Sequence, residues 1–271
     1  MLAVIGSPIR HSLSPVIFTA AFEALSLDYT YVAVEVPAGQ GAVAVEQARA
    51  AGVNGLSVTM PHKAAVLPAL DRLSAGAEAL GAVNTILRVG DELVGDNTDG
   101  PGFLDALAID EGFDPSGRRC VVFGAGGAAR AVILDLAASG AAEVVVVNRN
   151  PENADAAVRL AGEIGRIGEP ADVQQADLVV NATPMGMQGH PRDPVFDPSL
   201  IKQGQLIADL VYYPPLTPLV AAARERGAVA VNGLGMLIHQ AAHSFRLWTG
   251  QPAPLEVMSA AAVSRLSQDP R

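Results

Sequence analysis

The sequence feature that most constrains the fold is the stretch CVVFGAGGAARAV at residues 120–132, where a short apolar run meets a glycine cluster and then an alanine-rich segment. This order predicts a strand, a tight turn and a helix. The turn contains Gly124-x-Gly126-x-x-Ala129, the spacing of a dinucleotide-binding loop with alanine in its third position. Gly124 permits the sharp turn, Gly126 lets a pyrophosphate approach the backbone, and Ala129 lets the helix pack closely on the strand. The alternative is a glycine-rich turn that binds no ligand.

The overall composition narrows the class of protein and of partner. The 271 residues suffice for two domains, and a content that is 50% hydrophobic but only 4% aromatic suits the Ala-, Val- and Leu-rich layers of an α/β protein. A net charge of −10 argues against a nucleic-acid partner, which requires a basic face. The single cysteine, Cys120, excludes a disulfide framework, and neither a signal-peptide pattern nor an apolar stretch of about 18 residues is present. We therefore expect a cytoplasmic protein that binds no membrane, and the sequence leaves its oligomeric state open between monomer and homodimer.

The first hundred residues alternate between strand and helix patterns and form one α/β unit. The predicted strands are 2–6, 29–36, 56–60 and a hairpin of 83–89 with 92–94, and the predicted helices are 14–25, 41–51 and a segment from 62 onward. A linker rich in Pro, Gly and Asp follows at 112–117.

The second unit reads as a doubly wound, Rossmann-type parallel sheet, because its strands alternate with helices. The predicted strands are 121–123, 144–148, 178–181, 206–210 and 229–231. Two helices at 236–247 and 255–267 come after a hinge at 233–235, and a dinucleotide domain is complete without them. We therefore expect a discontinuous substrate-binding and catalytic domain of residues 1–100 and 236–271, and an NADP-binding domain of residues 101–235.

The tip of the second predicted strand in this domain indicates which dinucleotide binds. NAD enzymes carry an acidic residue there for the ribose 2′-hydroxyl, whereas NADP enzymes offer arginine to the 2′-phosphate. This chain has Asn148-Arg149-Asn150 and no acid at the tip, so NADP is favoured. Glu152 lies close enough in sequence to keep NAD possible, and a solvated Arg149 is the alternative.

Chemistry in the first unit centres on Lys63, which follows a strand tip, and on Asp99 near the domain boundary. An ammonium stabilises the charge that develops on a ketone oxygen during hydride transfer and donates the proton, while a carboxylate holds the ammonium. The alternative is a surface ion pair. Ser12 and Ser14 share one loop and are candidates to hold a small carboxylate, although Ser14 also fits a helix N-cap.

A pair of histidines, His239 and His243, has the i, i+4 spacing of a zinc-protease helix. The position of the general base holds Gln240 instead of glutamate, and no third ligand is indicated. We therefore expect no metal, and we interpret His62 and His190 as loop residues.

Nine motifs in their order along the chain resemble the shikimate dehydrogenase family. They are GSPIRHSLSP, GLSVTMPHK, GAVNT, GDNTDG, GAGGAAR, NRN, NATPMGM, DLVYYPPLTPL and GLGMLIHQAAHSF. The resemblance covers nearly the whole chain. It implies NADPH-linked, reversible reduction of 3-dehydroshikimate to shikimate, a step of chorismate and aromatic amino-acid biosynthesis.

The resemblance also assigns roles to residues within these motifs. It implies that Lys63 and Asp99 are the catalytic pair. The implied substrate-binding residues are Ser12, Ser14, Thr59, Lys63, Asn84, Asp99, Tyr212 and Gln240. The implied cofactor-binding residues are Gly124, Ala125, Gly126, Gly127, Ala128, Asn148, Arg149, Asn150, Leu210 and Gly233. Asn150 departs from the family, which usually has threonine or serine there, and this leaves the cofactor preference slightly open.

Three other functions compete with this interpretation. An NAD-linked quinate/shikimate dehydrogenase tends to carry an acid near Arg149, which this chain lacks. A non-catalytic NADP-binding sensor is disfavoured because Lys63 and Asp99 are both present. A structural α/β protein without a ligand does not explain the polar residues at so many strand tips.

Overall fold

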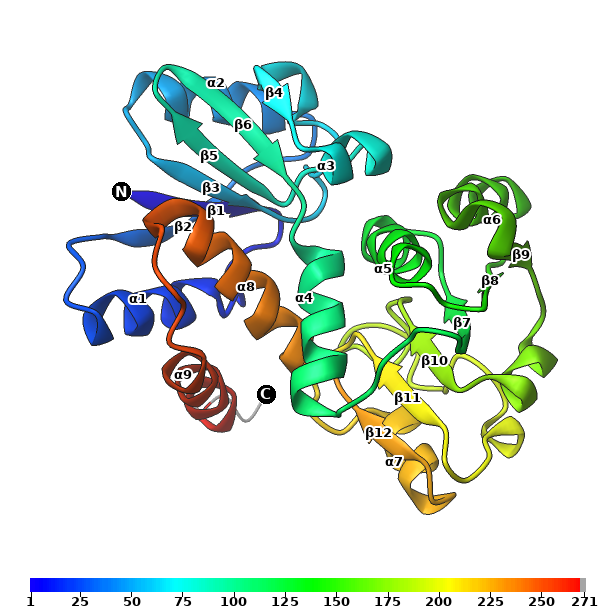
Figure 1. Ribbon diagram of the computed structural model, residues 1–271. Helices are drawn as coiled ribbons and strands as arrows, with labels where there is room; N and C mark the ends of the chain where they lie inside the picture. Colours follow the sequence, from blue (N-terminus) through cyan, green and yellow to red (C-terminus); the bar gives the residue numbers. More distant parts are fainter. Residues whose placement is uncertain (269–271) are drawn as a thin grey trace. The chain divides into compact units, whose positions relative to one another are not determined.

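The computed structural model describes residues 1–268, and the chain divides into two compact units (Figure 1). The first comprises Met1–Thr98 and the chain from Ile238 onward, and the second comprises Asp99–Leu237. The junctions therefore lie after residues 98 and 237, compared with the expected boundaries after 100 and 235.

The first unit is built on a mixed sheet with the strand order β2-β1-β3-β5-β6-β4. Its strands are β1 (Leu2–Gly6), β2 (Tyr31–Glu35), β3 (Gly55–Val58), β4 (Arg72–Leu73), β5 (Thr85–Val89) and β6 (Glu92–Asp96). The pairs β1–β2, β1–β3 and β4–β6 are parallel, and β3–β5 and β5–β6 are antiparallel. The predicted hairpin is confirmed as β5–β6, whose turn includes Gly90 at a φ of +62°.

Helices accompany this sheet, and the two C-terminal helices contribute to the same unit. They are α1 (Ser14–Ala24), α2 (Gly41–Ala50), η1 (Leu67–Ala69), α3 (Ala75–Leu80), the part of α8 (Leu234–Thr249) from Ile238 onward, and α9 (Leu255–Ser267). Trp248 of α8 donates from Nε1 to the carbonyl of Ile86 at 2.9 Å. The indole ring lies so close to Gly55 that a Cβ on that glycine would collide with it. The C-terminal segment is thereby fixed to β3 and β5.

The predicted helix from residue 62 onward is wrong. The segment forms turns and the single 3₁₀ turn η1, and the buried His62 ring shares a hydrogen bond of 2.8 Å with the carbonyl of Val36. Val66 and Ala69 are buried at the spacing of a helix face, but Pro68 removes a backbone donor between them. The short elements β4 and α3 had no clear periodic pattern and were not predicted.

The second unit is an all-parallel sheet with the order β12-β11-β10-β7-β8-β9. Its strands are β7 (Arg119–Phe123), β8 (Glu143–Val147), β9 (Gly165–Ile167), β10 (Leu178–Asn181), β11 (Leu206–Asp209) and β12 (Val229–Val231). The chain proceeds from β7 to β8 and β9 on one side, then returns to β10 on the other. This is the doubly wound dinucleotide-binding order, with its switch point between β7 and β10, so the predicted Rossmann-type fold is confirmed.

Helical segments connect these strands, and apolar side chains cover both faces of the sheet. The segments are α4 (Asp99–Asp105), η2 (Ala106–Asp110), α5 (Gly127–Ala138), α6 (Pro151–Val158), η3 (Arg159–Ile164), η4 (Pro170–Gln175), η5 (Pro198–Leu200) and α7 (Pro218–Glu225). Val144 and Val146 belong to the core on one face and Val145 to the core on the other. Burial raises the pKa of the Cys120 thiol in β7 to about 12, which makes this cysteine a packing residue.

No helix within residues 1–268 combines the length and apolar character needed to cross a membrane.

Candidate functional site

The two leading glycines of the β7–α5 loop have different environments. Gly124 adopts a φ of +112°, and a Cβ there would lie 2.9 Å from the carbonyl oxygen of Ala182. Gly126 is the N-cap of α5 and provides no side-chain cap, and its Cβ position faces open space. Ala129 is fully buried in the core between helix and sheet. The first N–H groups of α5 are consequently available to an anion at the switch point of the sheet.

A buried polar network fixes the two loops that follow β10 and β11. Asn181 donates from Nδ2 to Asp209 Oδ1 at 2.8 Å and accepts from the Thr183 hydroxyl at 2.7 Å. Asp209 also accepts from the Thr217 hydroxyl at 2.6 Å and from the backbone N–H of Val211 at 3.1 Å. Burial raises the pKa of Asp209, and these hydrogen bonds oppose that rise. The network therefore sets the shape of both loops at the carboxyl ends of the strands.

Two of the predicted cofactor residues, Leu210 and Gly233, lie side by side after β11 and β12. A Cβ on Gly233 would collide with the backbone of Leu210, and the N–H of Gly233 donates to the carbonyl of Val211 at 3.2 Å. Tyr212, in the same loop, is half-buried, and burial raises the pKa of its hydroxyl. This hydroxyl therefore stays protonated and can donate a hydrogen bond.

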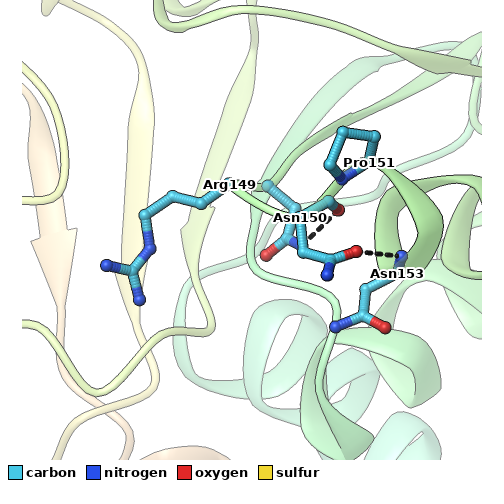
Figure 2. Close-up of a pocket in the computed structure, with 5 residues that line it drawn as sticks. Arg149, Asn150, Pro151 and Asn153 are labelled. Atoms are coloured by element: carbon cyan, nitrogen blue, oxygen red, sulfur yellow. Dashed lines mark hydrogen bonds between the residues drawn. The ribbon is translucent and has the colours of Figure 1, made fainter.

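A surface pocket of about 470 Å³ lies at the tip of β8 and is lined by Asn148, Arg149, Asn150, Pro151 and Asn153. Asn150 is the N-cap of α6: its Oδ1 accepts from the N–H of Asn153 at 2.9 Å. Asn148 donates from Nδ2 to the carbonyl of Asn150 at 2.9 Å. Figure 2 shows the exposed Arg149 side chain extending away from this cap. A cation and an amide are thus available to an anion at this strand tip.

In the first unit, a buried polar cluster joins β5, the end of β6 and α8. Asn84 donates from Nδ2 to the Thr98 hydroxyl at 3.0 Å and to Gln240 Oε1 at 3.5 Å, and its Oδ1 accepts from the N–H of Thr98 at 2.8 Å. The hydroxyls of Thr85 and Ser244 are 2.7 Å apart. The structure thus brings together Asn84 and Gln240, which are 156 positions apart in the sequence.

The loop that carries Ser12 is tied to the edge strand β2. Glu35 accepts from the Ser7 hydroxyl at 2.8 Å and from the N–H of Ile9 at 3.2 Å, and these two bonds lower the pKa of the Glu35 carboxyl. Ser12 Oγ accepts from the N–H of Ser14 at 3.3 Å. Glu35 therefore holds the start of the loop while the two serines remain next to each other.

Ser14 does not cap α1. It is the first residue of the helix, Leu13 occupies the N-cap position, and α1 has no side-chain cap. The capping alternative for Ser14 is thus excluded, and Ser14 is buried.

Thr59 and Lys63 follow β3 in a turn in which His62 donates its N–H to the carbonyl of Thr59 at 2.9 Å. A Cβ on Gly6 would collide with the Thr59 methyl group. The carbonyl of Lys63 accepts from the N–H of Val83 at 2.8 Å, and Lys63 is half-buried. These contacts hold the loop against β1 and the segment before β5.

Asp99 is buried and begins α4 in the second unit, whereas Lys63 lies in the first. The histidine pair is on α8, where His239 is buried and His243 Nδ1 lies 3.2 Å from an Arg246 Nη2 nitrogen. No group of three or more His, Cys, Asp or Glu side chains in residues 1–268 could hold a metal ion.

Sequence reasoning did not single out the residues that shape these sites: Thr85, Thr98, Asn181, Asp209, Thr217 and Ser244. All six lie within the recognised motifs. Thr85, Asn181 and Asp209 lie in strands, and the available signal for them was a polar residue in an otherwise apolar strand.

Three family models match the sequence. The "Shikimate dehydrogenase substrate binding domain" matches residues 4–86, a "Putative NAD(P)-binding" model matches 112–186, and the "Shikimate 5'-dehydrogenase C-terminal domain" matches 233–263. The shikimate dehydrogenase (NADP(+)) of Methanopyrus kandleri is 43% identical over 280 residues, covering 98% of this chain and 96% of the relative. The chain belongs to the shikimate dehydrogenase family.

Solved structures of similar proteins agree with this assignment. Shikimate 5-dehydrogenase from Thermus thermophilus, in complex with NADP(H) and shikimate, has a TM-score of 0.91 at 38% identity and covers 98% of both chains. Quinate dehydrogenase from Corynebacterium glutamicum, in complex with NAD, has a TM-score of 0.89 at 33% identity and covers 97% of this chain and 98% of its own. The family resemblance predicted from the motifs is confirmed.

Proposed function

We propose that this chain is an NADP-dependent shikimate dehydrogenase, which reversibly reduces 3-dehydroshikimate to shikimate in chorismate and aromatic amino-acid biosynthesis. The observation that carries the proposal is the near-complete match to relatives named shikimate dehydrogenase (NADP(+)), together with a lysine and an aspartate at the catalytic positions of the family motifs. The single buried cysteine suits a reducing cytoplasm, and the enzyme acts there as a monomer or homodimer.

The residues of the second unit fit a bound NADP. The open Cβ position of Gly126 and the uncapped start of α5 suit a pyrophosphate, with Gly124, Ala125, Gly127 and Ala128 forming the loop around it. The Arg149 guanidinium pairs with the 2′-phosphate. Because Asn150 caps α6 through Oδ1, its amide NH₂ is left to donate to the same phosphate, so asparagine performs the task that threonine or serine has in the family. Asn148 braces this tip, and Leu210 and Gly233 form the edge of the nicotinamide site.

On the substrate side, Ser12 and Ser14 hold the carboxylate, and Thr59, Asn84, Gln240 and Tyr212 orient the ring hydroxyls. When bound, NADPH supplies the hydride. The Lys63 ammonium stabilises the negative charge that develops on the ketone oxygen and donates the proton, and Asp99 holds the ammonium toward the substrate.

The use of lysine at position 63 is informative because lysine is rare in this chain. Of 18 basic residues, two are lysines, Lys63 and Lys202, which leaves 16 arginines. Arginine does not release a proton near neutral pH, whereas an ammonium does. We therefore expect Lys63→Arg to lose turnover by about 100-fold or more, close to the loss in Lys63→Ala, with NADP dissociation unchanged. The exposed Lys202→Ala is the matched control and should retain full turnover. Substantial turnover in the arginine variant would remove the proton-donor role.

The decisive experiment is a four-way assay of shikimate and quinate oxidation with NADP and NAD. The proposal predicts that shikimate with NADP gives the highest kcat/KM. A preference for NAD, or equal use of quinate, would instead favour the NAD-linked quinate/shikimate dehydrogenase. The absence of turnover with every pair, while NADP still binds, would favour a non-catalytic sensor.

A further inference from the structure

Four buried side chains of the first unit form a closed ring of hydrogen bonds beside Gln240. Asn84 donates from Nδ2 to the Thr98 hydroxyl at 3.0 Å, and Thr85 donates from its hydroxyl to Asn84 Oδ1 at 3.0 Å. Ser244 closes the ring, because its hydroxyl oxygen lies 3.2 Å from that of Thr98 and 2.7 Å from that of Thr85. Each of the four residues is at most 4% exposed, so this hydrogen-bond ring is sheltered from water.

The amide of Asn84 gives the hydrogen-bond ring one direction. The backbone N–H of Thr98 donates to Asn84 Oδ1 at 2.8 Å, which identifies this atom as the amide oxygen, because an NH₂ group accepts no hydrogen bond. The amide therefore donates at Thr98 and accepts at Thr85. Each hydroxyl has one proton and donates it to the next member of the ring, in the order Thr98, Ser244, Thr85. In this direction every hydroxyl donates once and accepts once.

Other contacts within the cluster allow a second arrangement of the protons, but it leaves Thr85 poorly satisfied. In that arrangement Ser244 donates to the carbonyl of Gln240 at 3.1 Å, and Thr98 donates to Asn84 Oδ1 at 3.3 Å. Thr85 then donates to Ser244 and receives no proton from the other two hydroxyls, since that of Thr98, 3.4 Å away, is already used. The closed ring satisfies the buried hydroxyls better and is therefore the more stable arrangement.

We propose that Thr85 and Thr98 are positioning residues of the substrate site: their bonds to Asn84 keep its amide oriented with Nδ2 toward Gln240 Oε1. These two atoms are 3.5 Å apart, which is long for a hydrogen bond. A substrate hydroxyl can accept from Nδ2 and donate to Oε1, whereas a keto or ether oxygen can only accept. The pair therefore suits an alcohol group. The inference rests on the proposed function, in which Asn84 and Gln240 orient the hydroxyls of the substrate.

The hydroxyl of Thr85 can be removed without changing the size of the side chain. In Thr85→Val the amide of Asn84 loses the donor that holds its oxygen. We expect the dissociation constant and the KM of shikimate to rise about tenfold, with kcat and the NADP dissociation constant within about twofold of wild type. Thr85→Ser keeps the hydroxyl and should bring both shikimate constants back to within about twofold. A merely structural role would lower the melting temperature of Thr85→Val but leave the affinity of the folded protein for shikimate unchanged.

Ser244→Ala is the matched control, because it removes a hydroxyl of the same hydrogen-bond ring but leaves both bonds to Asn84 in place. Its shikimate constants should stay within about twofold of wild type. A tenfold rise in this variant would show that affinity depends on the packing of the whole cluster, and it would overturn the specific role of Thr85 and Thr98.

The test measures the shikimate dissociation constant by calorimetric titration, together with KM and kcat, in these variants, in Asn84→Ala and in the double variant Thr85→Val/Asn84→Ala. A double variant that binds shikimate no more weakly than Asn84→Ala supports the proposal, because Thr85 then acts only through Asn84. Additive effects, or unchanged shikimate constants in Thr85→Val, would overturn it while leaving the substrate site intact. If Asn84→Ala itself binds shikimate as wild type does, the assignment of Asn84 in the proposed function fails as well.

A second substitution covers the case in which Thr85→Val does not fold. Thr98→Val breaks the hydrogen-bond ring at the other bond of Asn84, the one that Nδ2 donates. A rise of about tenfold in the shikimate dissociation constant would support the proposal, and an unchanged constant would overturn it.

Discussion

Asp135 is a carboxylate whose removal should stabilise the protein. It lies in α5, packed against Gly100 of α4 at a position where a Cβ on that glycine would collide with it. Its carboxylate has no hydrogen bond or ion pair among residues 1–268, and burial raises the pKa of Asp135 to about 6. Asp135→Asn keeps the shape and removes the charge.

The size of the effect follows from the shift. A rise from 3.8 to about 6 corresponds to about 3 kcal/mol, and partial exposure of the carboxylate reduces this to about 1–2 kcal/mol. The folded-state pKa is raised above the unfolded one, so the folded state holds the proton more tightly. The stability that this proton contributes is complete below about pH 4 and is lost as the pH rises through about 6. The variant should therefore be more stable than wild type by about 1–2 kcal/mol at pH 8 and nearly equal to it at pH 4.

Calorimetric unfolding at pH 4, 5, 6, 7 and 8 measures this difference. Asp193→Asn, at an exposed position in the same unit, is the control and should remain within about 0.5 kcal/mol of wild type throughout. An Asp135→Asn variant that is less stable than wild type at pH 8, or a gain that does not change with pH, would refute the reasoning.

Three further substitutions examine the second unit. Gly124→Ala combines a positive φ with a Cβ 2.9 Å from a carbonyl oxygen, so we expect a loss of about 3 kcal/mol in unfolding free energy; an unchanged melting temperature would contradict this. Thr217→Val removes the hydroxyl that donates to Asp209 and caps α7. We expect the free energy of unfolding, measured with denaturant, to fall by about 3 kcal/mol, and a fall below about 1 kcal/mol would argue against the network. Arg149→Ala should raise the NADP dissociation constant about 10- to 100-fold in a fluorescence titration but change that of NAD less than about twofold; equal weakening of both would exclude the 2′-phosphate contact.

The second unit was the more predictable from sequence. Parallel strands buried on both faces appear as uninterrupted apolar runs, such as the four valines that end β8, and the glycine loop identified the turn that follows β7. The strand β9 was missed because it has only three residues at the sheet edge, with the sequence GRI. The first unit was harder, since β4 has two residues and the segment after His62 takes its shape from tertiary contacts.

Some features of the candidate site could likewise be predicted from the sequence and others could not. The family motifs predict Lys63 and Asp99 as the catalytic pair from their positions within GLSVTMPHK and GDNTDG. The contact of Asn84 with Gln240 joins residues far apart in the chain, and the hydrogen bond from the Tyr31 hydroxyl to Ser57 joins strands β2 and β3. Such pairings depend on sheet register and helix packing, which leave no local signal in the sequence.

The two glycines at the start of α5 are constrained in different ways. The backbone itself demands glycine at 124, whereas at 126 an alanine would fit the folded chain and only a ligand approaching α5 would meet it. A substitution at position 124 therefore tests what the fold requires, whereas a substitution at position 126 tests what a bound ligand requires. We therefore predict that a relative that keeps Gly124 but has a larger residue at position 126 keeps the same fold and binds the dinucleotide more weakly.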